Sequence, residues 1–197
     1  MIEIRIHGRG GQGNVVAAYL LATTAINEGW HAQAFPAFGA ERRGAPVIAF
    51  VRINHQPIKR RCQVESPDFL IIQDEALMNI SGITDGLKSD GCILLNSAKS
   101  CEQYAAEHHA GNINHVLNKN LITLPATQLA QQYLGRPVPN TALLSAFLSL
   151  TGILTHDALI QSFKERFSGN VLDKNIDLIN AAEHTIPANL WKTTANA

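Results

Sequence analysis

Cysteine is scarce in this chain of 197 residues, and its spacing excludes several kinds of protein. The three cysteines, Cys62, Cys92 and Cys101, are odd in number and contain no Cys-x-x-Cys pair. Such a pattern defines neither a disulfide framework nor a zinc or iron–sulfur ligand set, and it fits a reducing compartment best. Cys92 lies within an apolar run, so we expect a small buried hydrophobic residue there.

Long hydrophobic runs are also missing. No apolar stretch approaches the roughly 20 residues that cross a membrane, and residues 1–7 alternate between apolar and polar, unlike a signal peptide. We therefore expect a soluble, cytoplasmic protein. With 46% hydrophobic and 16% charged residues, the chain can bury one sizeable core. The prediction is a single domain over residues 1–197, with a loose tail after about residue 190.

Charge is balanced overall but unevenly distributed. Residues 1–61 hold eight Lys or Arg against three acids, and the remainder holds eight against thirteen. Either one face meets an anionic partner, or the imbalance is neutralised across the fold. A pI near 7.1 argues against general nucleic-acid binding.

The hydrophobic pattern alternates between strands and helices. Strands are expected at 1–7, 30–35, 45–53, 68–73, 91–96 and 121–124. Helices are expected from the first glycine cluster to about Gly29, between the fourth and fifth strands, at 126–133, from a cap at Asn140 or Thr141, from a cap at Thr155, and at 172–183. This order predicts a doubly wound α/β fold, with a mainly parallel sheet, flanking helices and a helical C-terminal end.

A glycine turn follows the first strand. Its Gly8-x-Gly10-x-x-Gly13 spacing matches the dinucleotide fingerprint, and a helix follows as that fingerprint requires. A nicotinamide site also needs an acid near the end of the second strand, but Phe35-Pro36 stands there, and no Gly-Lys-Ser/Thr of a P-loop is present. The turn is thus interpreted as a tight structural turn, or as one wall of an anion site shared with a partner.

The segment from Ala34 to Val47 combines aromatics, prolines, glycines and the pair Arg42-Arg43 between two expected strands. Aromatics on a loop can anchor an interface, and arginines can bind carboxylate or phosphate. A rigid loop with solvated arginines is the alternative. Because the segment follows the second strand, it should lie at the same sheet edge as the glycine turn. Residues 59–61, all basic, extend this region either as a rim contact or as a solvated run.

No catalytic residue or metal ligand is predicted. His108, His109 and His115 lack the i, i+4 spacing of a helical metal site. The sequence contains no Gly-x-Ser-x-Gly, so it provides no nucleophile elbow.

Several motifs, taken together and in order, resemble one known family. They are Gly8-Arg9-Gly10-Gly11-Gln12-Gly13, the Phe-Pro-x-Phe-Gly-x-Glu-Arg-Arg-Gly-Ala-Pro core of 34–47, Phe50-Val51-Arg52-Ile53, Pro67-Asp68, Pro125-Ala126-Thr127 and Asn140-Thr141. Over nearly the whole chain they are similar to the gamma subunit of 2-oxoacid:ferredoxin oxidoreductases, and Phe35-Pro36-Ala37-Phe38-Gly39 resembles the pyruvate branch.

The resemblance implies that pyruvate, coenzyme A (CoA) and oxidised ferredoxin give acetyl-CoA, carbon dioxide and reduced ferredoxin. It also implies that thiamine diphosphate, Mg²⁺ and [4Fe-4S] clusters lie on other subunits, that the partners are alpha, beta and delta-type subunits, and that ferredoxin or flavodoxin accepts the electrons. This chain would bind no cofactor and would not be active alone.

The resemblance assigns this chain subunit packing and CoA contact. Backbone donors from Gly10, Gly11, Gln12 and Gly13, with charge from Arg42 and Arg43, would meet either CoA phosphates or a neighbouring subunit. Two alternatives stay open: a free-standing enzyme that binds a dinucleotide at the glycine turn, and a non-catalytic assembly module on the same scaffold.

Overall fold

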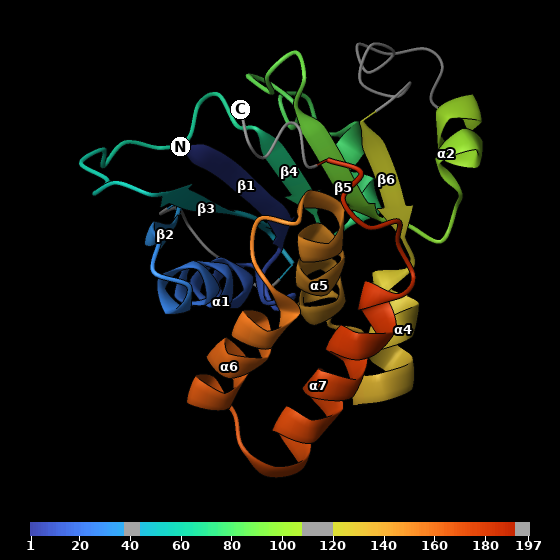
Figure 1. The fold of residues 1–197 in the computed structure, drawn as a ribbon. Coiled ribbons are helices and arrows are strands. Elements are labelled where there is room, and N and C mark those ends of the chain that lie inside the picture. The colour runs from blue at the N-terminus through green and yellow to red at the C-terminus, as the bar shows by residue number, and fades with distance from the viewer. Residues whose placement is uncertain (38–43, 108–119, 192–197) are drawn as a thin grey trace.

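A computed structural model describes residues 1–37, 44–107 and 120–191, and within these ranges six strands form one sheet (Figure 1). The order across the sheet is β2-β3-β1-β4-β5-β6. The strands are β1 (Ile2–Arg9), β2 (His31–Pro36), β3 (Pro46–Asn54), β4 (Phe69–Ile72), β5 (Cys92–Asn96) and β6 (Leu121–Leu124). Each coincides with a strand predicted from the sequence, to within a few residues at either end.

The sheet is mixed but mainly parallel. Strands β1, β4, β5 and β6 pair in parallel, whereas β3 runs antiparallel to both β1 and β2. Only nine residues separate the end of β2 from the start of β3, fewer than the dozen or more that a parallel crossover needs, so these two strands pair antiparallel. The predicted α/β fold with a mainly parallel sheet is confirmed, and β3 is the exception within it.

Helices cover the two faces of the sheet unequally. On one face the larger core joins the sheet to α1 (Asn14–Asn27), α4 (Ala126–Leu134), α5 (Asn140–Thr151), α6 (His156–Arg166) and α7 (Gly169–Glu183) (Figure 1). On the other face a smaller core includes residues of η1 (Glu75–Asn79) and α2 (Cys101–Glu107). The predicted helical C-terminal end therefore forms most of the thicker layer.

Helix α5 lies at the centre of that layer, and every one of its residues is buried. Phe147 meets Phe69 of β4 edge to face, with ring centroids 5.2 Å apart. The Ser145 hydroxyl donates to the Ile179 carbonyl of α7, which satisfies a polar group in an otherwise apolar helix. The sequence prediction of a helix that is apolar almost all round, and therefore buried, is confirmed.

Helix boundaries were predicted less well than helix existence. The helix expected between the fourth and fifth strands is only the short 3₁₀ helix η1, because Gly82 and Gly86 adopt positive φ in the turns that follow. Helix α5 has Pro139 at its N-cap, so neither Asn140 nor Thr141 caps it. Thr155 caps α6 as predicted, accepting a hydrogen bond from the Ala158 N–H. Helix α7 begins at Gly169 rather than Leu172, and α2 was not predicted.

Strand β1 is buried on both faces, although its sequence alternates. Ile2, Ile4 and Ile6 face the larger core, while Glu3, Arg5 and His7 are buried on the other side. Loops cover these polar groups: Arg5 Nη2 donates to the carbonyls of Ile83 and Asp85, at 3.0 and 2.6 Å. Burial lowers the pKa of the Arg5 guanidinium, and the nearby Asp85 carboxylate partly opposes that shift.

None of the helices within the described ranges combines the length and apolar character that a membrane crossing requires.

Candidate functional site

The glycine turn joins the end of β1 to α1 and is fastened to the start of β3. The Gly10 N–H donates to the Ala45 carbonyl at 2.9 Å, and the Gly10 carbonyl accepts from the Gly44 N–H at 3.2 Å. Gly13, the N-cap of α1, has a φ of 81°, and a Cβ there would lie 2.7 Å from Asn140 Nδ2. Glycine is therefore needed at position 13 for both backbone conformation and space.

The four predicted backbone donors divide into two pairs. Gly10 and Gln12 use their N–H groups inside the turn, since the Gln12 N–H donates to the Arg9 carbonyl at 3.0 Å. The N–H groups of Gly11 and Gly13 have no hydrogen-bond partner within the described ranges. The Gln12 side chain folds back, and its Oε1 accepts from the Arg9 N–H at 2.7 Å. Among the described residues, Gly11 and Gly13 are thus the two positions of the turn whose amides remain unpaired.

Arg42 and Arg43 lie outside the described residues. Gly44 and Ala45, which follow them directly, contact the glycine turn as described above, and Arg9 Nη1 donates to the Gly44 carbonyl at 3.1 Å. The end of the arginine segment and the glycine turn therefore meet at the same sheet edge, as the order of the strands predicted.

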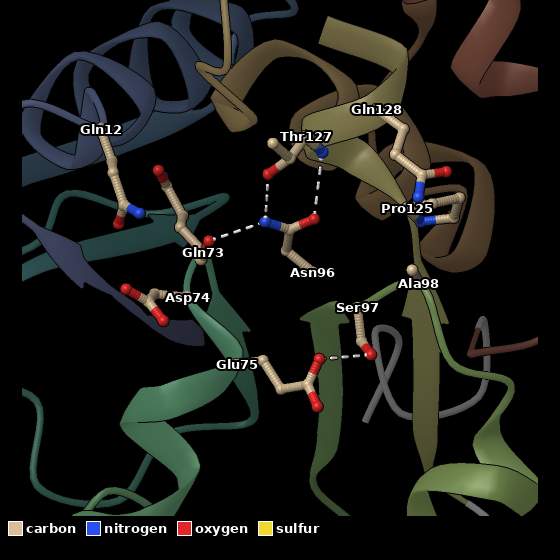
Figure 2. A pocket seen from close by; sticks show the side chains of 10 residues that line it. All are labelled: Gln12, Gln73, Asp74, Glu75, Asn96, Ser97, Ala98, Pro125, Thr127 and Gln128. Atoms are coloured by element: carbon tan, nitrogen blue, oxygen red, sulfur yellow. Dashed lines mark hydrogen bonds between the residues drawn. The ribbon is translucent and has the colours of Figure 1, made fainter. Parts of the chain in front are cut away.

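A cavity of about 380 Å³ opens beside the turn, where β4, β5 and β6 end (Figure 2). Its lining is formed by side chains from the turn, from the residues after these strands and from the start of α4: Gln12, Gln73, Asp74, Glu75, Asn96, Ser97, Ala98, Pro125, Thr127 and Gln128. Its volume lies within the roughly 300–1,000 Å³ typical of small-molecule sites. Of the predicted site residues that the structure describes, only Gln12 belongs to this cavity.

Asn96 organises the far wall of the cavity. Its Nδ2 donates to the Gln73 carbonyl and to Thr127 Oγ1, each at 2.8 Å, and its Oδ1 accepts from the Thr127 N–H at 3.1 Å. One side chain at the end of β5 thus fixes the end of β4 and the first turn of α4 (Figure 2). The amide acts at the start of α4 as a cap would, because it satisfies a backbone donor of the first turn.

Both carboxylates of the cavity are already engaged. Asp74 Oδ2 lies 2.6 Å from Arg9 Nε, and Asp74 Oδ1 accepts from the Ala76 N–H. Glu75 accepts from the Ser97 hydroxyl at 2.7 Å and lies 3.0 Å from Lys99 Nζ. Hydrogen bonds to Glu107 and Glu75 raise the pKa of Lys99. The acids therefore hold the cavity wall together.

Gln73 is the least satisfied residue of the site. It is 1% exposed, and both amide atoms of its side chain lack a hydrogen-bond partner among the described residues. Asn14, at the start of α1, is also buried; its Nδ2 donates to the Val47 carbonyl, but its Oδ1 has no partner within the same ranges. Unpaired buried amide atoms are rare in folded proteins, so this end of the sheet is unusually polar for its burial.

The sequence did contain a signal for these residues. Gln73, Asn96 and Pro125 each directly follow a predicted strand or end one, and ligands of open α/β sheets bind at the carboxyl ends of the strands. The glycine and arginine motifs alone gave no indication of these residues.

A second cluster has the outline of a catalytic triad but not its chemistry. Ser149 Oγ lies 3.4 Å from His156 Nε2, and His156 Nδ1 lies 3.4 Å from Glu183 Oε1. However, His156 Nε2 is 3.0 Å from the Ser145 carbonyl, which can only accept a hydrogen bond. The proton on Nε2 is therefore directed to that carbonyl, and this nitrogen is not the base that a serine nucleophile needs.

The remaining predicted features are placed as follows. Cys92 is buried, as expected for a small hydrophobic residue, whereas Cys62 is exposed. Arg60, in the basic run 59–61, reaches only within 3.9 Å of Glu3. His108, His109 and His115 lie outside the described residues. Within the ranges that the structure describes, no group of three or more His, Cys, Asp or Glu side chains is placed to hold a metal ion.

Fold and site together define an α/β domain that has a glycine turn between its first strand and its first helix. A polar cavity lies at the carboxyl edge of its sheet. The family model for pyruvate ferredoxin/flavodoxin oxidoreductase matches residues 3–184, and the chain belongs to this family. The resemblance to its gamma subunit, and the prediction of a subunit of a 2-oxoacid:ferredoxin oxidoreductase, are confirmed.

Named relatives agree with this assignment. The chain is 47% identical over 182 residues to pyruvate synthase subunit PorC of Methanothermobacter marburgensis, covering 92% of this chain and 96% of that one. It is 42% identical over 175 residues to the pyruvate/ketoisovalerate oxidoreductases common subunit gamma of Pyrococcus furiosus, covering 89% and 91%. The crystal structure of pyruvate oxidoreductase subunit PORC from Thermotoga maritima superposes with a TM-score of 0.78 at 34% identity, covering 93% and 95%.

Proposed function

We propose that the complex to which this chain belongs oxidises pyruvate in the cytoplasm, and that this subunit helps to bind CoA. Pyruvate and CoA give acetyl-CoA, carbon dioxide, a proton and two electrons, which pass one at a time to ferredoxin or flavodoxin. Similarity to relatives named for pyruvate supports this substrate. The observation that carries the proposal is the family match over residues 3–184.

The catalytic groups of this reaction belong, in the proposal, to alpha, beta and delta-type partner subunits. Thiamine diphosphate with Mg²⁺ supplies the carbanion chemistry and [4Fe-4S] clusters carry the electrons, both on those partners. The relative from Pyrococcus furiosus is named as common to a pyruvate and a ketoisovalerate oxidoreductase. A subunit shared in this way supports locating the choice of 2-oxoacid on other chains.

For this chain the proposal assigns the CoA phosphates to the glycine turn. The N–H groups of Gly11 and Gly13 are free of partners within the described ranges, and the N-terminus of α1 adds partial positive charge. Arg42 and Arg43 would supply full charges at the same edge, because the residues after them contact the turn. Gly10 and Gln12 maintain the shape of the turn.

The experiment is steady-state kinetics of the assembled complex that carries Arg42→Ala. A CoA KM raised about tenfold with kcat and assembly unchanged supports ligand binding, since a lost ion pair to phosphate weakens binding. Loss of the complex on gel filtration supports a subunit-packing role instead and removes the CoA assignment. Lys164→Ala, on an exposed position of α6, is the matched control and should change neither quantity.

A second measurement concerns the division of labour among subunits. The purified full-length chain alone should neither oxidise pyruvate with CoA nor reduce ferredoxin, and adding the other subunits should restore both activities. Turnover by the chain alone would contradict the proposal. Micromolar binding of NAD to the chain in a calorimetric titration would instead revive the dinucleotide alternative.

A further inference from the structure

Strand β2 leaves one edge of the sheet open. It is the last strand on its side and pairs only with β3 among the described strands. Beyond its end the ladder continues, since the Ala37 N–H donates to the Ile48 carbonyl at 2.8 Å. Alternate residues of an antiparallel strand bond to the same neighbour, so the odd-numbered residues of β2 bond to β3. Ala32 and Ala34 therefore direct their N–H and C=O groups outward, and these groups meet no backbone partner within the described ranges.

This open edge lacks the usual protection. The sequence of β2, HAQAFP, contains no Asp, Glu, Lys or Arg. Exposed edge strands usually carry charged side chains, bulges or a covering segment, because unpaired backbone groups otherwise pair with another chain. Pro36 removes one N–H at the end of the strand, but the outward amides of Ala32 and Ala34 remain. An uncharged edge of this kind is typical of a strand that pairs with a further strand.

Helix α1 packs on β2 and β3 and extends the uncharged surface (Figure 1). None of its 14 residues is Asp, Glu, Lys or Arg, although Tyr19 is 45% exposed and Ile26 is 55% exposed. Helix α5 is also uncharged, but it is buried throughout. A helix at a protein surface normally carries charged residues on its outer side. The composition of α1 is therefore that of a helix whose outer side is covered.

Tyr19 and Ile26 lie on one side of α1. They are seven residues apart, which is about two turns of helix. Thr24 faces α6, since its hydroxyl lies 3.2 Å from that of Ser162. Ile26 follows two residues later, about 200° around the helix, and so points away from α6. The two exposed side chains thus form an apolar stripe on the outer side of α1, the helix that covers the open edge strand.

We propose that this neutral face, made of the outward edge of β2 at Ala32 and Ala34 and the stripe of Tyr19 and Ile26, binds a second copy of this chain. Two β2 strands that pair antiparallel about a two-fold axis give each outward N–H a carbonyl of the other copy. Because Pro36 supplies a carbonyl but no N–H, neither copy has an outward donor left over. The inference goes beyond the proposed function, since neither CoA binding nor packing against other subunits requires a second copy.

Self-complementarity favours a second copy as the occupant. A two-fold axis brings a patch onto itself, so a patch of one charge would repel its copy, whereas an uncharged patch does not. Interface cores are likewise depleted in charged residues and enriched in aromatic ones such as Tyr19. Because α1 packs on both β2 and β3, the two α1 helices become neighbours across the axis, and their stripes are covered. One strand edge and one stripe make a modest contact, so we expect a dissociation constant on the order of 10 µM.

Sedimentation equilibrium of the full-length chain at about 1–100 µM measures this association. The wild type should dimerise. Ala34→Pro should weaken the dimer by about tenfold or more, because proline removes an outward N–H and no hydrogen bond to β3. Ile26→Glu should weaken it at least as much, since it places like charges across the axis. Val171→Glu, at a position of α7 that is 43% exposed, is the matched control and should dimerise like the wild type.

The outcomes separate the possible occupants. A wild-type chain that stays monomeric at about 100 µM overturns the inference, as does a dimer that survives both Ala34→Pro and Ile26→Glu. If the chain is monomeric while Ile26→Glu prevents assembly with the other subunits, the face binds a different partner and the second-copy assignment fails. Should Ala34→Pro unfold the chain, Ile26→Glu decides alone, because an exposed helix position tolerates substitution.

Discussion

The Nε atom of Arg52 lies 2.7 Å from Oε1 of Glu3, and this buried ion pair joins β3 to β1. The same guanidinium donates to the carbonyls of Cys62 and Gln63, at 2.8 and 3.1 Å, and lies 5.7 Å from the centroid of the Phe35 ring. A single side chain therefore connects three strands and a loop. Its five donors in a planar fork suit this task, whereas a lysine has one point charge.

Arg52→Met should reduce the free energy of unfolding by about 3–5 kcal/mol, because Glu3 would remain buried without its cation. Urea unfolding of the full-length chain measures this. The control is Lys88→Met, which removes a more exposed pair with Asp68 and should cost no more than about 1 kcal/mol. Equal losses in the two variants would show that burial does not set the strength of the Arg52 pair.

Gly8→Ala tests the close approach of α1 to β1. A Cβ at position 8 would fall among the Oδ1, Nδ2 and Cγ atoms of Asn14, whose Nδ2 is bonded to the Val47 carbonyl. We expect a loss of about 1–3 kcal/mol from this overpacking. In the Asn14→Ala background the same substitution should cost much less, because the clashing amide is gone. Additive losses in this double-mutant cycle would contradict the proposed contact.

Asn96→Asp should loosen the cavity wall. The carboxylate cannot donate to the Gln73 carbonyl, and it would place a negative charge against that oxygen. A loss of about 1–3 kcal/mol on unfolding is expected, together with a higher CoA KM in the assembled complex. Asn120→Asp removes a comparable pair of donations, to the Asp90 and Gly91 carbonyls at the other end of the sheet, and is the control: it should leave the CoA KM unchanged. An unchanged CoA KM in Asn96→Asp would separate this wall from the ligand site.

His7 should make the chain sensitive to mild acid. Burial, and secondarily the charge of Arg5, lower the pKa of His7 to about 3 in the folded chain, whereas the unfolded value is near 6.5. The unfolded state therefore binds the proton first: stability is complete above pH 6.5 and is lost as the pH falls from 6.5 toward 3. At pH 5 the loss amounts to about 2 kcal/mol.

Unfolding curves of wild type and His7→Leu between pH 7 and pH 4.5 measure this effect. The variant should lose less stability than the wild type over that range, while His184→Gln, at an exposed position, should follow the wild type. Parallel losses in wild type and His7→Leu would assign the acid sensitivity to other groups.

Local pattern was enough for most of the fold. Alternating and continuous apolar runs identified all six described strands, and Thr155 and Gly29 identified helix ends, because capping and positive φ depend on neighbouring residues only. The prediction was poorer where distant segments decide. A period-two pattern gives no indication that loops will cover Glu3, Arg5 and His7, or that β3 will insert between β1 and β2.

The candidate site divides in the same way. Sequence by itself determined the family, the glycine turn and its place at the sheet edge, since strand, turn and helix are consecutive in the chain. Tertiary structure alone decided that Gly10 and Gln12 use their N–H groups inside the turn, and that Gln73, Asn96 and Thr127 gather beside it. Gln73, Asn96 and Thr127 are far apart in sequence, and the parallel pairing of β4, β5 and β6, with α4 directly after β6, brings them together at one end of the sheet.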